Sequence, residues 1–166
     1  MFAATPPAPD APAPATPAAW VAHGLRLERD ARNASALAAY DRALALDPAW
    51  EPAWMRKALL LEELGRDHEA LAVYAALLQR IPAHTAALSN QAGLYLRLGQ
   101  PELALDALDR ALAADPDNLL LVLNQGLLLL QGLDRPADAL PLLERAASAG
   151  LPEAQEPLAW CKQALA

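Results

Sequence analysis

Hydrophobic positions recur along this chain at a helical spacing, and the helical stretches come in pairs. Between residues 51 and 64 the inward positions are Trp54, Ala58 and Leu61, which lie on one face of a 3.6-residue helix. Gly65 ends this stretch, because glycine readily adopts the left-handed conformation of a helix C-terminus. A second helical stretch follows directly. The pattern therefore predicts two helices joined by a short turn.

This pair of helices recurs with a period of 34 residues. Large apolar residues keep the period at Trp20, Trp54, Leu88 and Val122. Small residues keep it at Gly24, Ala58, Ala92 and Gly126. A fixed period of this length indicates stacked units, none of which buries its apolar face alone. We expect four units, over residues 17–50, 51–84, 85–118 and 119–151.

Two segments lie outside these units. Residues 1–16 are rich in alanine and proline, which predicts an extended, disordered arm. Residues 152–166 resemble the first helix of a further unit, with Trp160 in the place of Trp54. We expect this segment to form a C-terminal capping helix that covers the open end of the stack and buries Trp160.

The fourth unit departs from the period by one residue. Its second helix carries inward residues at Ala139, Leu143 and Ala146, each one position later than the period requires. We place the extra residue in the turn at 132–135, because turns tolerate insertions best. The first helix of this unit, 119–130, is apolar all round. Such a helix is either buried on every side or forms a docking surface.

Composition and charge restrict the class of protein. The chain is 55% hydrophobic but only 5% aromatic, so its core is built from alanine and leucine, which favour helices. A formal net charge of −7 argues against binding to nucleic acid or to an anionic membrane. The longest charge-free stretch, 119–133, is too short for a membrane span. A single cysteine, Cys161, excludes an internal disulfide and fits a cytoplasmic location.

Residues that carry chemistry are scattered. The three histidines have no metal-ligand spacing, and no serine lies in a nucleophile motif. We expect no enzymatic activity, no metal and no cofactor.

The repeated residues resemble the tetratricopeptide repeat. The second unit matches its pattern at Trp54, Ala58, Leu61, Gly65, Ala70, Tyr74 and Pro82. The resemblance implies an all-α fold: a right-handed α-α superhelix of about four helix-turn-helix units with a C-terminal capping helix.

In this family the first helices of the units line a concave groove that binds protein. The positions that carry over to this chain are Val21, Leu25, Met55, Leu59, Glu62, Ser89, Asn90, Leu96, Leu123, Asn124, Leu127 and Leu130. The resemblance gives Asn90 and Asn124 the role of bonding the backbone of a bound peptide.

The resemblance predicts a non-enzymatic adaptor that binds a peptide or helical segment of a partner protein in this groove. Two alternatives stay open. One is a self-associating assembly scaffold, a homodimer that pairs through the apolar fourth unit. The other is a small chaperone of the kind that serves secretion.

Overall fold

The computed structural model describes residues 14–166, so the predicted arm at 1–16 lies outside the described residues except for its last three positions. The described part of the chain is helical and contains no strand, which confirms the all-α prediction. It divides into two compact units at the boundary between Gly65 and Arg66. No helix in this part of the chain is long and apolar enough to cross a membrane.

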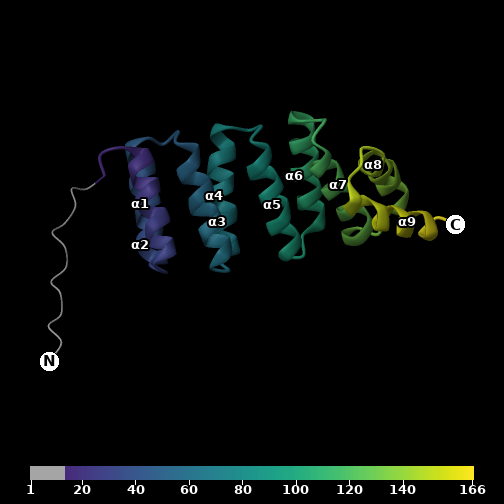
Figure 1. Ribbon diagram of the computed structural model, residues 1–166, viewed down its shortest axis with the longest axis horizontal. Coiled ribbons are helices and arrows are strands. Elements are labelled where there is room, and N and C mark those ends of the chain that lie inside the picture. Colours follow the sequence, from purple (N-terminus) through teal and green to yellow (C-terminus); the bar gives the residue numbers. More distant parts are fainter. Residues whose placement is uncertain (1–13) are drawn as a thin grey trace, which may run out of the picture. The chain divides into compact units, whose positions relative to one another are not determined.

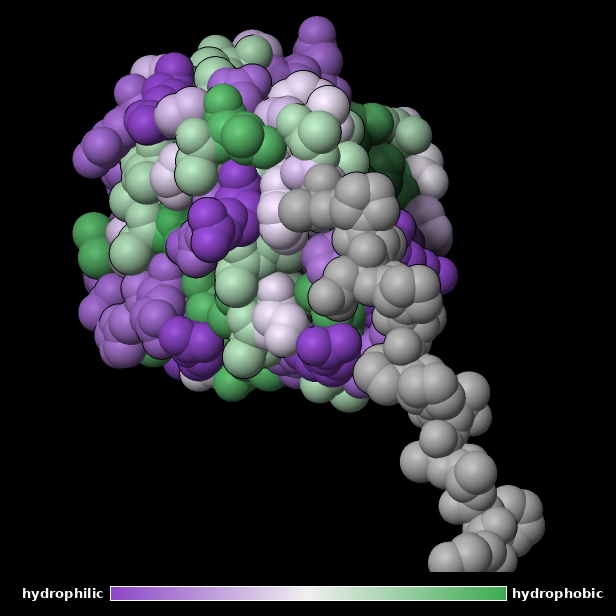
Figure 2. Space-filling view, turned by 90° about the vertical axis from the view of Figure 1, so that its left-hand side faces the viewer, coloured by the Kyte–Doolittle hydropathy of each residue, from purple (hydrophilic) through white to green (hydrophobic). Residues whose placement is uncertain are grey.

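The first unit contains three helices. They are α1 (Pro17–Arg29), α2 (Asn33–Leu46) and α3 (Glu51–Glu63). In this unit α1 packs along α2, and α2 packs against α3 (Figure 1). Figure 2 views the side of the molecule that carries α1 and α2, where hydrophobic and hydrophilic residues are interspersed. The core of the unit surrounds the fully buried side chain of Tyr40.

The second unit holds the remaining helices. They are α4 (Asp67–Arg80), α5 (Thr85–Arg97), α6 (Pro101–Ala114), α7 (Leu119–Leu127), the π-helix η1 (Leu128–Gly132), α8 (Pro136–Ser148), the 3₁₀ helix η2 (Pro152–Ala154) and α9 (Gln155–Ala164). Successive helices pack against one another, from α4 on α5 to α8 on α9. Each first helix lies antiparallel to the second helix of its pair, which follows from the short turns between them (Figure 1).

Small residues at the repeated positions allow the two helices of a pair to approach closely. A Cβ atom on Gly126 would lie 2.9 Å from Leu143 Cδ2, and one on Gly24 would lie 2.8 Å from Tyr40 Cζ. Real Cβ atoms do not come this close to their neighbours, so only glycine fits at these two positions without a shift of the facing side chain.

Polar residues cap the first helices at the same period. The side chains of Thr16, His84 and Asn118 accept hydrogen bonds from the backbone N–H groups of Ala19, Ala87 and Leu121. Each bond satisfies an N–H group that has no partner within the helix. Thr16, the last residue of the predicted arm, is therefore the N-cap of α1, and His84 has the same structural role for α5.

The fourth helix pair corrects one sequence prediction. We expected its extra residue in the turn at 132–135, but that turn has the usual three residues, as the turns after α1, α3 and α5 do. The extra residue lies inside the helix, where η1 widens the last turn and Leu133 N–H bonds to Leu128 O at 3.0 Å. A single π turn absorbs one inserted residue and keeps the helix continuous. The inward residues of α8, Ala139, Leu143 and Ala146, are fully buried as predicted.

The C-terminal helix corrects a second prediction. Trp160 is 49% exposed, while its neighbour Cys161 is fully buried. The inward residues of η2 and α9 are Ala154 and Cys161, seven apart, as Ala87 and Leu94 are in α5. This register places Trp160 one position away from the buried stripe, and a shift of one residue turns a side chain by about 100° around the helix.

Candidate partner-binding site

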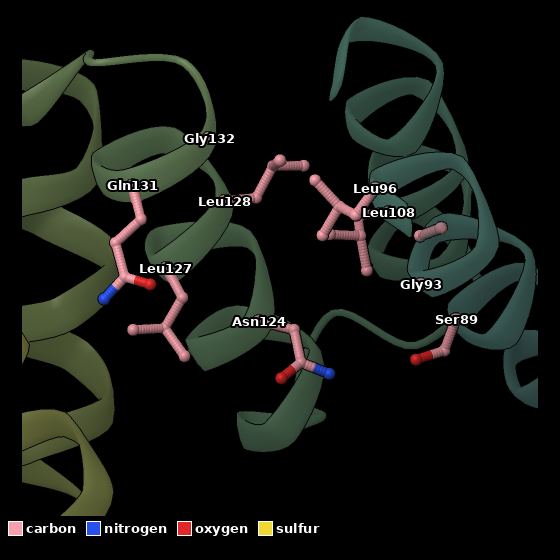
Figure 3. Close-up of a pocket in the computed structure, with 10 residues that line it drawn as sticks. Ser89, Gly93, Leu96, Leu108, Asn124, Leu127, Leu128, Gln131 and Gly132 are labelled. Carbon is pink, nitrogen blue, oxygen red and sulfur yellow. The ribbon is translucent and has the colours of Figure 1, made fainter. Parts of the chain in front are cut away.

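A hollow of about 420 Å³ in the second unit is the candidate binding site. It lies between α5 on one side and α7 with η1 on the other, and α6 contributes its floor (Figure 3). The residues that line it are Ser89, Ala92, Gly93, Leu96, Leu108, Asn124, Leu127, Leu128, Gln131 and Gly132. Its volume lies in the range of sites that hold a small molecule or a few side chains of a peptide.

Helix periodicity explains which residues reach the hollow. On α5, Ser89, Gly93 and Leu96 follow one another at steps of four and three, so they share one face. Gly93 has no atom of a neighbouring residue within 4 Å of its would-be Cβ, so the absence of a side chain there leaves open space. From the opposite wall Leu128 points toward Leu96 (Figure 3).

The lining is uncharged and combines apolar with polar side chains. Leu96 is 41% exposed and Asn124 is also exposed, whereas Leu108 is buried beneath them. Ser89, Asn124 and Gln131 can each donate and accept a hydrogen bond. None of the three has a hydrogen-bond partner among the described residues. The hollow can therefore hold an apolar side chain and bond the peptide groups beside it.

A smaller hollow of about 280 Å³ adjoins the first on the same unit and shares Ser89 and Asn124 with it. Asn90 lines this second hollow. Its Nδ2 donates a hydrogen bond of 3.0 Å to the hydroxyl oxygen of Tyr74, and the residue is half-buried. Of the two asparagines singled out in the sequence, Asn124 is thus the one with an unengaged side chain.

Three predicted groove residues are buried, which corrects their assignment to a partner surface. Val21 belongs to the core of the first unit. Leu123 and Leu130 belong to a cluster of the second unit that also contains Leu143 and Cys161. Their helix faces point toward α8 and α9, because this face of α7 is where the following helices pack.

The remaining predicted residues divide between the two units. The structure brings Ser89, Leu96, Asn124 and Leu127 together in the hollow. Those of the first unit are half-buried and are not among its lining residues: Leu25, Met55, Leu59 and Glu62.

The sequence reasoning missed Leu128 and Gln131 on the lining. On α7 and η1 we expected the stripe Leu123, Leu127 and Leu130, but of these three only Leu127 lines the hollow, together with Asn124, Leu128 and Gln131. The periodicity could have found Gln131, since it lies seven residues after Asn124 and so on the same face.

No group of three or more histidine, cysteine, aspartate or glutamate side chains in residues 14–166 is arranged to hold a metal ion.

Comparison with known families agrees with this architecture. The family model of the Psidin N-terminal TPR repeats region matches residues 28–126, more than half of the chain. The chain belongs to this family of tetratricopeptide repeats. No curated protein matches its sequence.

Several solved tetratricopeptide repeat structures share the fold. A tetratricopeptide repeat protein from Parabacteroides merdae ATCC 43184 is 22% identical, with a TM-score of 0.76 over 93% of this chain and 60% of that one. MamA from Desulfovibrio magneticus RS-1 is 22% identical, with a TM-score of 0.67 over 84% and 77% of the two chains. YrrB, described as a TPR protein with an unusual peptide-binding site, is 20% identical, with a TM-score of 0.70 over 86% and 74%. The chain thus spans less than two thirds of the Parabacteroides protein.

Proposed function

We propose that this tetratricopeptide repeat protein is a non-enzymatic adaptor that binds a peptide or helical segment of a partner protein in the hollow between α5 and α7. The observation that supports the proposal is the lining itself. The exposed Leu96 and the half-buried Leu127 lie beside Ser89, Asn124 and Gln131, whose side chains have no hydrogen-bond partner in the described part of the chain. A soluble partner segment would satisfy both kinds of group at once.

The side chains that line the hollow indicate the size and polarity of the segment that would bind there. Leu96, Leu127 and Leu128 form an apolar pocket for one leucine-sized or larger side chain. Asn124 lies at the edge of this pocket, where its carboxamide can donate to a peptide carbonyl and accept from a peptide N–H. Since no charged residue lines the hollow, we expect the bound residue to be apolar and uncharged.

Selection of peptides from a displayed library on the full-length chain tests this proposal. The affinity of a selected peptide should fall by about tenfold or more in Leu96→Asp and in Asn124→Ala, because the first places a charge in the apolar pocket and the second removes the carboxamide. The matched control is Leu103→Asp on α6, because Leu103 is 49% exposed and does not line the hollow.

Equal affinities of the parent and both hollow variants for every selected peptide would place the binding surface elsewhere. Far-ultraviolet circular dichroism of each variant checks that the helices remain folded. Leu96 and Asn124 are both exposed, so their replacement leaves the core intact.

Homodimerisation through the apolar face of α7 has less support than peptide binding, because Leu123 and Leu130 are buried within the second unit. The cytoplasmic location remains part of the proposal, as a reducing compartment suits the single buried thiol of Cys161.

A further inference from the structure

The first unit carries a second hollow, of about 430 Å³, on the face formed by α1 and α2. Trp20, His23 and Leu27 of α1 line one side. Ser35, Ala38, Ala39 and Arg42 of α2, with Arg32 of the turn, line the other. This surface is separate from the candidate site between α5 and α7.

The burial of positions equivalent to Trp20 can be compared along the repeats. Trp54 in α3, Leu88 in α5 and Val122 in α7 correspond to Trp20; Leu88 and Val122 are 0% exposed, and Trp54 is half-buried. A preceding helix packs on each of these three helices, α2 on α3, α4 on α5 and α6 on α7. Among the described residues no helix precedes α1, and Trp20 and His23 are only half-buried. In residues 14–166 no helix packs on α1 in the way that α2, α4 and α6 pack on the first helices of the later repeats.

The contacts made at positions equivalent to His23 in other repeats indicate the charge of a helix that would dock on α1. Lys57 of α3 occupies this position in the second repeat, and its Nζ lies 2.6 Å from Asp41 Oδ1 of α2. Gln125 of α7 occupies it in the fourth repeat and donates a hydrogen bond to Asp109 of α6. In both cases the carboxylate belongs to the helix that precedes. A helix docked on α1 is thus expected to present a carboxylate to His23.

The rim of this hollow adds positive charge. Arg32 and Arg42 both line it, and no acidic side chain does. Neither arginine has an ion-pair partner among residues 14–166. The face therefore suits a helix with acidic and large apolar side chains.

The opposite end of the chain exposes such a helix. Glu156 and Trp160 of α9 are four residues apart and so lie on one face, which is exposed at both positions. Glu153 lies one turn earlier and is also exposed. Neither glutamate has an ion-pair partner in the described part of the chain, whereas Lys162 on the same helix is 3.2 Å from Glu144. The exposed face of α9 is acidic and carries an unburied tryptophan.

We infer that α9 of one copy of this chain docks on the α1–α2 face of a second copy. Glu153 and Glu156 then oppose His23, Arg32 and Arg42, and Trp160 fills the apolar part of the hollow beside Trp20. The two surfaces are different, so the contact is head-to-tail and leaves one surface of each kind free at the two ends. Contacts of this kind extend into chains of copies.

Sedimentation velocity of the full-length chain over a wide range of concentrations tests the inference. The average mass should rise with concentration and fall as salt is added, because the contact joins opposite charges. Trp160→Ala should weaken self-association by about tenfold or more, because a large apolar side chain is lost from the interface. A chain that stays monomeric at every concentration overturns the inference.

Charge reversal identifies the two surfaces. Arg32→Glu with Arg42→Glu should abolish self-association, and so should Glu153→Arg with Glu156→Arg, since each pair creates like charges across the contact. An equal mixture of these two double variants should associate again, because each reversed surface meets an opposite charge on the other variant.

The matched control for the arginine double variant is Arg29→Glu with Arg110→Glu. It changes the net charge by the same amount at exposed positions outside both surfaces, so association should stay as in the parent. The four residues reversed in the two double variants are exposed, so these variants are expected to fold: Arg32, Arg42, Glu153 and Glu156. Association that persists in either double variant, or a mixture that stays monomeric, contradicts docking of α9 on the α1–α2 face.

Discussion

At the scale of the residue, one backbone conformation recurs after the first helix of each pair. Ala31, Gly65, Gly99 and Asp134 have φ values of 56°, 69°, 69° and 51°. The left-handed region costs a residue with a Cβ about 1–2 kcal/mol, while glycine enters it freely. The sequence reveals this position where glycine occupies it. At Ala31 and Asp134 the packing of the two helices imposes the conformation on a residue that does not favour it.

Ala31→Gly should therefore raise the free energy of unfolding by about 1 kcal/mol, because relief of the left-handed strain outweighs the extra freedom of glycine in the unfolded chain. Urea denaturation measures the difference. The matched change in the opposite sense, Gly65→Ala, should lower the free energy of unfolding by a similar amount, about 1 kcal/mol. An Ala31→Gly variant less stable than the parent would show that the turn does not strain Ala31.

Tyr40 gives the first unit a dependence on alkaline pH. Burial raises the pKa of its hydroxyl group well above the ordinary value, and the hydrogen bond that it donates to Glu28 raises it further. Above pH about 10 the unfolded chain releases this proton while the folded chain keeps it, so the stabilising contribution of Tyr40 declines as the pH rises.

Tyr40→Phe should thus be less stable than the parent near neutral pH by about 1 kcal/mol, the contribution of the lost hydrogen bond. The difference should shrink as the pH is raised above about 10. Denaturant midpoints measured for both proteins across this range provide the test. A constant difference would mean that Tyr40 ionises as readily in the folded chain as in the unfolded one.

At the scale of the element, the fourth helix pair shows what a repeat pattern leaves undecided. The late positions of Ala139, Leu143 and Ala146 reveal that one residue has been inserted, but not where. Keeping the turn at three residues preserves the hydrogen bond of 2.7 Å from Arg135 N–H to Leu129 O, and the π turn keeps Leu128, Leu129 and Leu130 buried. The choice between the two places depends on packing in three dimensions, which a periodicity in one dimension does not contain.

The register of α9 was mispredicted for a similar reason. We aligned α9 by the resemblance of Trp160 to Trp54, but the residues of this segment that pack into the core are Ala154, Leu158 and Cys161. The small side chains of Ala154 and Cys161 allow α9 to lie close against α8, and the Sγ of Cys161 donates a hydrogen bond of 3.0 Å to Pro136 O.

Two substitutions on α9 separate these registers. At a concentration where the protein is monomeric, Trp160→Ala should change the free energy of unfolding by no more than about 0.5 kcal/mol, as for an exposed position. Cys161→Ala should lower it by about 1 kcal/mol, because it removes a buried group. Burial also raises the pKa of the Cys161 thiol, so Ellman's reagent should react with the folded protein slowly and with the unfolded protein at the ordinary rate. Rapid reaction with the folded chain, or a large loss of stability in Trp160→Ala, would show that α9 buries Trp160 and exposes Cys161.

At the scale of the whole molecule, the 34-residue period predicted the helix pairs because it reports directly on burial. Of the α5 residues that the resemblance assigns to a groove, Ser89 and Leu96 line the hollow. On the α7 side Asn124, Leu128 and Gln131 line the hollow, each one position after a residue of the expected stripe, because Leu123 and Leu130 pack toward α8 and α9. Asn124, which the sequence placed beside the groove, is the residue that reaches the hollow from this side.

Binding of a partner segment in the hollow between α5 and α7 can be followed by a map of backbone amide chemical shifts, which locates the contacts residue by residue. The isotopically labelled full-length chain is titrated with a peptide selected on it. We expect the largest shifts at Ser89, Gly93, Leu96, Asn124 and Leu127, and we expect them to weaken in Asn124→Ala. Largest shifts on α1 and α2, or on the exposed side of α6, would show that the segment binds elsewhere.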